Sequence, residues 1–294
     1  MLPQLYRKFI PQNIRDKIYD AFLGQILSFG RSFDDNIKSK YIYLFRKILP
    51  DTERNRFYTF MGKYGVTAYP YPFMLEYKKL SIDCRFDNEY GMNYIVHFGK
   101  RLYFPKFMDR RTIIISYRNL LIEQDDRSPH QYVKNISRLK GKILLDIGAA
   151  EGIFTLNCID ILKYAYLFEC DEEWIEAITV TFAPWKDKVT IVQKYVGDTN
   201  DNNNITIDRF LEDKAKDNLF LKMDIEGYEQ AALHGSENIL KNAQNIDFSI
   251  CTYHKREDAV EIAAILRSYG FVYEYTAGVL YFEKEFRTAI IRSC

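Results

Sequence analysis

The sequence predicts an α/β fold: a Rossmann-like, seven-stranded sheet whose last strand is antiparallel, preceded by a mainly helical N-terminal unit. Three observations predict it. From Lys142 onward, five short apolar runs alternate with helical patterns, which indicates βαβ units and a parallel sheet. The chain ends in two β-rich runs instead of a further helix. Residues 1–75 show helical spacing of apolar residues without such alternation.

Charge divides the chain into two parts. Residues 1–120 contain 21 Lys and Arg against 11 Asp and Glu, whereas residues 121–294 contain 20 against 29. This asymmetry predicts an N-terminal unit over 1–120 and a second domain over 121–294. The basic unit either faces an anionic glycan, a membrane surface or an acidic partner, or it docks on the acidic half. Nucleic acid is not expected, because no recognition motif accompanies the charge.

Cysteine usage and the chain start bear on the compartment. The five cysteines show no C-x-x-C spacing, and the first residues lack an apolar stretch like a signal peptide's. No window approaches the ~18 apolar residues of a membrane span. We therefore expect a cytoplasmic protein. It would be peripheral to the inner membrane if the aromatic, basic segment from Leu2 to Phe29 lies on a membrane surface; the alternative is a helix packed on its own domain.

The elements before the sheet follow from local patterns. Apolar spacing predicts helices within residues 1–75. The stretch "MNYIVHFGKRLYFPKF" (92–107) holds two aromatic and branched runs around a central glycine, which predicts a hairpin. Residues 112–126 predict a helix that leads toward the second domain. Ser128 and Pro129 suit an N-cap and a first helical position, so another helix is expected over 128–135.

The second domain has the regular pattern. The expected strands are 142–148, 165–170, 189–193, 219–224 and 246–251, and the expected helices lie near 152–163, 172–182, 206–215, 227–241 and 256–269. The stretch "FVYEYTAGVLYFEKE" (271–285) predicts a closing hairpin that turns at 276–278 and supplies the antiparallel strand. A dinucleotide dehydrogenase would more usually add a sixth parallel strand. The topology therefore favours a class I methyltransferase fold.

A cofactor motif follows the first strand. Asp146 ends that strand, and Gly148, Ala149 and Gly152 belong to the next turn, whose spacing is not G-x-G-x-x-G. An acid before such a turn suits the ammonium group of S-adenosylmethionine, which carries no phosphate. The alternative is an ordinary tight turn.

Two further strand ends and one preceding segment complete this prediction. Glu169, at the end of the second strand, is placed to accept ribose hydroxyls, unless it is a solvated strand end. Where the third strand ends, either Asp198 or the backbone near Tyr195 and Val196 borders the expected adenine position. His130 precedes the first strand, so its segment is placed to cover the pocket.

The expected chemistry lies at the fourth strand end. Asp224 is a candidate general base, substrate ligand or metal ligand. Lys222, two residues earlier on the same strand face, is a candidate catalytic residue that is placed to pair with Asp224. Glu226 is either part of this site or an acid at the start of the next helix. His254 follows the fifth strand at the same edge and suits proton transfer, with Asp258 to orient it or to cap a helix. Asp224, Glu226 and His254 are also candidate metal ligands, although their spacing fixes no site.

Four stretches resemble a known family. "LLDIGAAEGIFTL", "LFECDEEW", "LKMDIEGYEQAALHG" and "YHKREDA" resemble the FkbM family of S-adenosylmethionine-dependent methyltransferases, over about residues 120–285. The K-x-D-x-E-G-x-E block from Lys222 to Glu229 is the most specific element. "EQDDRSPHQY" (123–132) resembles a segment that precedes the domain in some glycan-directed members. One departure from the wider class is Ala150, where a glycine is common.

The resemblance implies O-methylation of hydroxyls on sugars, lipids or polyketides. It matches the cofactor-binding positions to Asp146, Gly148, Gly152 and Glu169, and the acceptor-side positions to Asp224, Glu226 and His254.

The resulting hypothesis is an S-adenosylmethionine-dependent O-methyltransferase that acts on a sugar hydroxyl of a bacterial surface polysaccharide or its precursor. A sugar or glycan acceptor is the expected partner. A glycan-assembly enzyme or a membrane surface is a further expected partner, bound through the basic N-terminal unit. A divalent metal is left open. Two alternatives also stay open: a nicotinamide-dependent oxidoreductase, and a methyltransferase-fold scaffold without activity.

Overall fold

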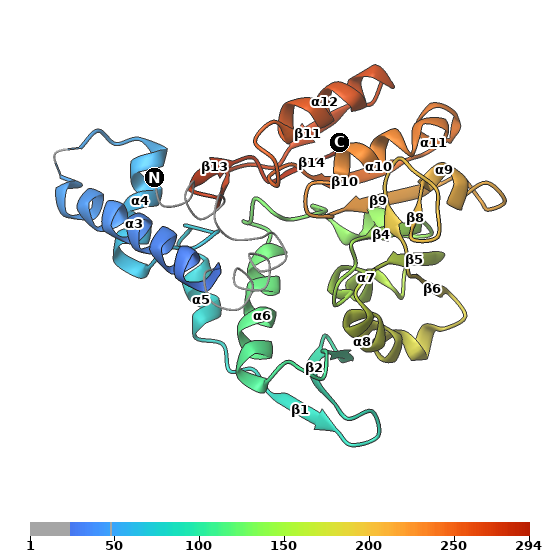
Figure 1. Cartoon of the computed structure of the whole chain (residues 1–294), viewed down its shortest axis with the longest axis horizontal. Helices are drawn as coiled ribbons and strands as arrows, with labels where there is room; N and C mark the ends of the chain where they lie inside the picture. The colour runs from blue at the N-terminus through green and yellow to red at the C-terminus, as the bar shows by residue number, and fades with distance from the viewer. Residues whose placement is uncertain (1–23, 48) are drawn as a thin grey trace, which may run out of the picture. The chain divides into compact units, whose positions relative to one another are not determined.

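The computed structural model describes residues 24–47 and 49–294, so most of the segment predicted over Leu2–Phe29 lies outside the described residues (Figure 1). The chain divides into two compact units between Pro72 and Phe73. Sequence patterning instead placed a boundary at 120/121. Among the described residues, no helix combines the length and the apolar character needed to cross a membrane.

The first unit contains two helices that pack closely. They are α3 (Gly24–Phe45) and α4 (Glu53–Tyr64), and the Thr52 side chain caps α4 by accepting from the Asn55 amide. A Cβ on Gly62 would lie 2.2 Å from the Ser39 carbonyl oxygen, so only glycine permits this approach of the two backbones. Tyr58 and Met61 of α4 are buried.

The second unit is built on a seven-stranded sheet. Its strand order is β11-β14-β10-β9-β4-β5-β6, and β14 runs antiparallel to both of its neighbours. The strands are β4 (Ile143–Ile147), β5 (Tyr164–Phe168), β6 (Val189–Val192), β9 (Leu219–Met223), β10 (Asp247–Cys251), β11 (Tyr273–Tyr275) and β14 (Ile290–Ser293). This mixed sheet with one antiparallel strand confirms the predicted class I methyltransferase fold.

Helices connect and cover these strands. They are α7 (Ile153–Cys158), α8 (Glu172–Phe182), α9 (Ile207–Phe210), α10 (Glu229–His234), α11 (Glu237–Asn242) and α12 (Asp258–Ser268), with the short turns η2 (Ile136–Leu139) and η3 (Ala183–Trp185) and the short pair β7 (Tyr195–Val196) and β8 (Asn204–Ile205). Residues of α9 to α12 share one apolar core with alternate residues of β4 and β9. On the other face, Phe154 of α7 contacts Phe220 of β9. The central strands are therefore buried on both faces, which explains their continuous apolar runs.

A smaller sheet joins the same unit. After α5 (Met74–Lys78), β1 (Cys84–Asp87), β2 (Met92–His97) and β3 (Lys100–Tyr103) form an antiparallel sheet, followed by α6 (Arg110–Glu123). The predicted hairpin is confirmed, with Phe98 and Gly99 at positive φ in its turn. The Tyr103 amide donates to Thr181 Oγ1 on α8. Such contacts place residues 73–120 with the large sheet and explain why the boundary falls earlier than the charge pattern indicated.

Two predicted elements are wrong in detail. Residues 128–135 form a loop instead of a helix. The final hairpin has different partners, because β11 pairs with β14, whereas β12 (Leu280–Phe282) pairs with β13 (Glu285–Arg287) through a turn at Glu283 and Lys284. Both turn residues have positive φ, the geometry that closes a two-residue hairpin. The β12–β13 ribbon is thus an insertion before the last strand.

His97 ties the small sheet to its neighbours and predicts a pH effect on stability. The buried ring lies 2.7 Å from the Tyr117 hydroxyl on α6 and 2.5 Å from Asn157 Oδ1 on α7. Burial lowers the pKa of His97 below 6.5, the Asn157 contact opposes this shift, and Lys100 adds to it. The unfolded chain therefore binds this proton more readily, so stability is complete above pH 6.5 and falls as pH drops toward the folded pKa.

We expect the urea-unfolding free energy to decrease between pH 7.5 and 5.5, and to decrease less in His97→Gln. Burial also lowers the pKa of His130, to about 4, so part of the wild-type slope belongs to that residue. The difference between the two proteins isolates His97. Equal slopes would contradict the assignment.

Candidate active site

A cavity of about 850 Å³ opens at the carboxyl ends of the parallel strands. Of the predicted site residues, Gly148, Glu169, Val196, Asp224 and Glu226 line it. Phe168, Trp174, Tyr195 and Tyr228 add aromatic surface. Ligands of open α/β sheets bind outside the carboxyl ends of the strands, and this cavity occupies that position. It joins the predicted cofactor side, at β5, to the predicted acceptor side, at β9.

The glycine turn after β4 packs closely against other segments of the same unit, near Asp224 and Phe182. Gly148 has φ +76°, and a Cβ there would lie 2.0 Å from the Asp224 carbonyl oxygen. Gly152 has φ +74° at the start of α7, and a Cβ there would lie 2.7 Å from the Phe182 ring. Neither Gly152 nor the buried Ala149 lines the cavity. Of the predicted turn residues, only Gly148 therefore faces a ligand.

Gly148 and Gly141 provide a matched test of this turn. Gly141 precedes β4 with φ +73° and has open space where a Cβ would lie. Gly141→Ala should cost about 1–2 kcal/mol of unfolding free energy, the strain of a left-handed alanine. Gly148→Ala should cost roughly 2–5 kcal/mol, because the turn must also move away from Asp224. Urea unfolding measures both, and equal costs would mean that the Gly148 contact relaxes freely.

Glu169 is held at the mouth of β5 by backbone amides. Its Oε1 accepts from Cys170 and Asp171, and its Oε2 accepts from Ala150, all at 2.7–2.9 Å. These bonds fix the carboxylate across the glycine turn and leave further acceptor capacity on both oxygens. The carboxylate therefore faces the cavity in a fixed orientation, and its role toward ribose hydroxyls stays a prediction.

Asp146 and Lys222 lie beneath the cavity and do not line it. They occupy paired positions on β4 and β9, with Lys222 Nζ 3.0 Å from Asp146 Oδ1. Thr155 Oγ1 also donates to Asp146, and Lys222 Nζ to the Gly148 carbonyl. Burial lowers the pKa of Lys222, but Asp146 and Asp224 together outweigh burial and raise the pKa above its usual value, so the lysine stays charged. In contrast to the sequence interpretation, Lys222 pairs with Asp146, and this buried pair supports the glycine turn.

Asp224 is the centre of a polar cluster at the cavity wall. The Tyr132 hydroxyl donates to Oδ2 at 2.7 Å, and the Tyr253 hydroxyl donates to Oδ1 at 3.4 Å. His254 Nε2 lies 3.4 Å from Oδ1, and His130 Nε2 lies 3.8 Å from Oδ2. Burial raises the pKa of Asp224, but the combined effect of His130, Lys222 and His254 is larger and lowers it, so the pKa of Asp224 lies below 3.8. Asp224 is therefore a carboxylate at neutral pH.

The segment before the sheet delivers two of these side chains. Asp125 accepts from the Tyr77 hydroxyl at 2.5 Å and binds the Arg127 guanidinium. The loop that follows brings His130 and Tyr132 to the carboxyl edge of β9 and β10. His130 is buried beside Asp224 and is not a cavity-lining residue. His130 was predicted to cover the cofactor pocket, whereas in the structure it lies beside Asp224, on the predicted acceptor side.

His254 is oriented by Glu229, which was not among the predicted site residues. Glu229 is fully buried, and its Oε1 lies 2.8 Å from His254 Nδ1 and accepts from the Ile225 amide. His254 Nε2 is buried and makes no hydrogen bond within residues 24–47 and 49–294. Burial lowers the pKa of His254, but Glu229, Asp224 and Glu226 together outweigh burial, so the pKa of His254 lies above 6.5. A fixed, basic imidazole therefore points its second nitrogen toward Asp224.

The remaining predicted acids have other roles. Asp258 accepts hydrogen bonds from the Lys255 amide and from the Gln230 side chain. It therefore stabilises the start of α12 and does not orient His254. The Glu226 side chain is 88% exposed and lies 3.7 Å from His254 Nε2, at the cavity rim. Because α10 begins at Glu229, Glu226 precedes the helix and does not cap it. The sequence held one signal that could have identified Glu229 as a site residue: it is the last acid of the E-G-x-E spacing in the Lys222–Glu229 block.

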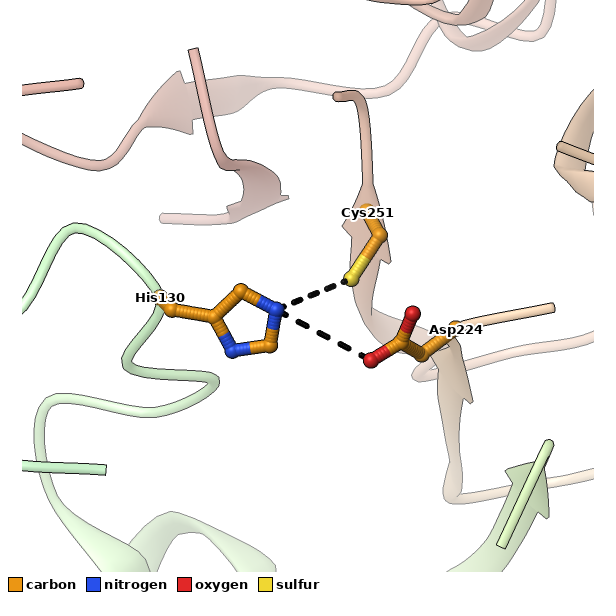
Figure 2. A group of neighbouring side chains, drawn as sticks. All are labelled: His130, Asp224 and Cys251. Atoms are coloured by element: carbon orange, nitrogen blue, oxygen red, sulfur yellow. Dashed lines mark hydrogen bonds and ion pairs between the residues drawn. The ribbon is translucent and has the colours of Figure 1, made fainter. Parts of the chain in front are cut away.

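Two groups in the described chain have the residue types and closeness of a metal site. One is His130, Asp224 and Cys251, drawn in Figure 2, and the other is Asp224, Glu229 and His254. In each group, one ligand atom per residue lies within 4.8 Å of the others. Of the candidate ligands Asp224, Glu226 and His254, both groups include Asp224, one includes His254 and neither includes Glu226.

One family model matches a part of this chain. Residues 188–273 match the family described as Methyltransferase FkbM domain, a range that includes the Lys222–Glu229 block and His254. The resemblance stated from the motifs is confirmed over these residues. The matched range begins after the glycine turn, so it covers the acceptor side of the cavity more fully than the cofactor side. Among curated proteins, no relative matches this chain.

Solved structures give similarities of low identity. A methyltransferase FkbM from Methylobacillus flagellatus KT shares 17% identity at a TM-score of 0.43, over 61% of this chain and 54% of that chain. The METTL16 MTase domain shares 14% at 0.43, over 85% and 94%. A precorrin-6y C5,15-methyltransferase from Geobacter metallireducens GS-15 shares 13% at 0.39, over 57% and 89%. The chain thus spans little more than half of the Methylobacillus protein.

Proposed function

Starting from the FkbM methyltransferase domain in residues 188–273, we propose that this chain is an S-adenosylmethionine-dependent O-methyltransferase. We propose a hydroxyl group of a sugar as its acceptor, in a bacterial surface glycan or its precursor. The observation that carries the proposal is the pairing of buried Glu229 with His254, whose Nε2 lies 3.4 Å from Asp224 on the wall of the cavity. A proton acceptor oriented by a second group is what a hydroxyl nucleophile requires.

The residues of the cavity fit the cofactor. Glu169 offers a fixed carboxylate for ribose hydroxyls, and Trp174 and Tyr195 offer flat surface near Val196 for an adenine ring. Gly148 lets the chain pass close to a ligand without a side chain in the way. Asp146 cannot take the direct ammonium contact predicted for it, because Lys222 and Thr155 hold its carboxylate below the cavity. When bound, S-adenosylmethionine supplies a methyl group on a sulfonium leaving group.

The acceptor-side residues orient the acceptor hydroxyl and remove its proton. Asp224, a carboxylate on the cavity wall, accepts the hydrogen bond that orients the acceptor hydroxyl. His254 Nε2 takes the proton as the acceptor oxygen attacks, and Glu229 stabilises the resulting imidazolium through Nδ1. The imidazole would then carry the proton that the hydroxyl releases, while the sulfonium would supply the methyl group and leave as a neutral thioether. Tyr132 and Tyr253 fix the carboxylate of Asp224 by donating to it.

Two measurements test the proposal. Calorimetry should detect S-adenosylhomocysteine binding and no comparable NAD binding; tight NAD binding alone would instead support the oxidoreductase hypothesis. Mass spectrometry of surface glycans should show sugars lighter by one methylene group in cells that lack the gene, with recovery on complementation. Unchanged glycans in cells that otherwise express the protein would exclude the glycan acceptor, and cofactor binding without any acceptor would favour an inactive scaffold.

A further inference from the structure

We propose that His130, Asp224 and Cys251 form a binding site for one zinc ion beside the acceptor position (Figure 2). Asp224 directly follows β9, and Cys251 ends β10. The parallel register pairs Met223 with Ile250, so the next residues on both strands lie side by side. His130 comes from the loop before β4 and points its Nε2 at both. The topology thus gathers an imidazole, a carboxylate and a thiol from three separate segments.

The distances between the ligand atoms fit an ion better than they fit strong hydrogen bonds. His130 Nε2 lies 3.7 Å from Cys251 Sγ and 3.8 Å from Asp224 Oδ2. With zinc bonds of about 2.0–2.1 Å to nitrogen and oxygen and about 2.3 Å to sulfur, the edges of a tetrahedron are about 3.3 Å (N to O) and about 3.5 Å (N to S). The observed separations exceed these edges by only a few tenths of an ångström. The nitrogen–oxygen distance is too long for a hydrogen bond.

The second group at this edge does not have such spacing. Glu229 Oε1 lies 2.8 Å from His254 Nδ1, a hydrogen-bond distance that leaves no room for an ion between the two atoms. That pair is therefore the proton-transfer dyad, and the His130 group is the metal site. Asp224 borders both, with Oδ2 toward His130 and Oδ1 toward His254.

Burial and donor chemistry select the ion. His130 and Cys251 are 2% and 0% exposed, so bulk water does not compete with these two side chains for the ion. A set of one nitrogen, one sulfur and one oxygen suits zinc and excludes magnesium and calcium, which prefer oxygen. Tyr132 donates to Asp224 Oδ2 and would orient that ligand, as outer hydrogen bonds do in zinc sites.

Three protein ligands leave a fourth position, and Asp224 lies on the cavity wall. A water or the acceptor oxygen would fill that position, where zinc lowers the pKa of the bound oxygen and eases proton loss to His254. This catalytic use rests on the proposed function, whereas zinc binding itself does not.

The experiment measures metal and cofactor separately on the full chain. Elemental analysis of the purified protein should find about one zinc per chain. Cobalt added to the metal-stripped protein should give a thiolate-to-cobalt absorption band. Cys251→Ser should abolish that band and lower zinc affinity at least about ten-fold, as should His130→Asn. Cys158→Ser, which changes another buried cysteine, should leave both unchanged.

Calorimetry with S-adenosylhomocysteine reports whether each variant is folded, and its failure in wild type would count against the proposed function alone. If Cys251→Ser fails to fold, the wild-type cobalt spectrum decides. The site is overturned if wild type that is folded by circular dichroism neither retains zinc nor gives a thiolate band, whether or not it binds S-adenosylhomocysteine. It is also overturned if Glu229→Gln loses the metal and Cys251→Ser keeps it.

Discussion

Replacing His254 with Asn should lower the rate of methyl transfer by roughly 10²–10⁴-fold, the usual contribution of a positioned general base. The asparagine amide can still donate to Glu229 Oε1 in place of Nδ1, so the buried carboxylate keeps a partner. What the variant loses is Nε2, the buried nitrogen that faces Asp224. Because His254 lies behind Asp224 and does not line the cavity, the affinity for S-adenosylhomocysteine should change by less than about two-fold.

The measurement is transfer of a labelled methyl group from S-adenosylmethionine to glycan extracted from cells without the gene. His234→Asn is the matched control, because this histidine is exposed at the end of α10 and contacts none of the site residues described above. A His254→Asn rate within a few-fold of wild type would remove His254 as the base. A parallel loss of S-adenosylhomocysteine binding would show instead that the substitution disrupts the cavity.

Much of the fold was predictable because buried parallel strands leave a strong signal. Runs such as "LFLKM" are apolar on both faces, since helices cover both sides of the sheet. The positions of Glu169, Asp224 and His254 at one sheet edge followed from the same alternation. Strand order is fixed by packing across the sheet, and the sequence indicated only that the last strand would run the other way.

The pairings within the site were less predictable. Glu229 meets His254 across 25 residues, and this contact depends on how β9 and β10 lie in register and on how α10 starts. The pairing of Asp146 with Lys222 depends in the same way on the register of β4 and β9. A sequence shows that two acids lie at strand ends, but it does not show which lysine or histidine each will meet. The β12–β13 ribbon was missed because its turn residues, Glu283 and Lys284, carry no glycine or asparagine signal.

Glu229→Gln separates the two acids of the "DIEGYE" block. Glutamine keeps the shape and one acceptor oxygen, so the bond from the Ile225 amide can persist. It removes a charge that is fully buried and whose Oε2 has no hydrogen-bond partner in the described part of the chain. Such a charge is costly to bury unless it is used, which argues for a role in supporting His254.

We expect Glu229→Gln to lower the methyl-transfer rate at saturating acceptor by roughly 10²–10³-fold, because the imidazolium formed during proton transfer loses its buried counter-charge. The affinity for S-adenosylhomocysteine and the thermal midpoint should stay near wild type, which a purely structural role would not allow. Glu226→Gln should have the smaller effect, since the Glu226 carboxylate is 88% exposed and screened by water. If the order of the two variants were reversed, the exposed acid at the cavity rim would be the partner of His254, and Glu229 would serve only to join α10 to the end of β9.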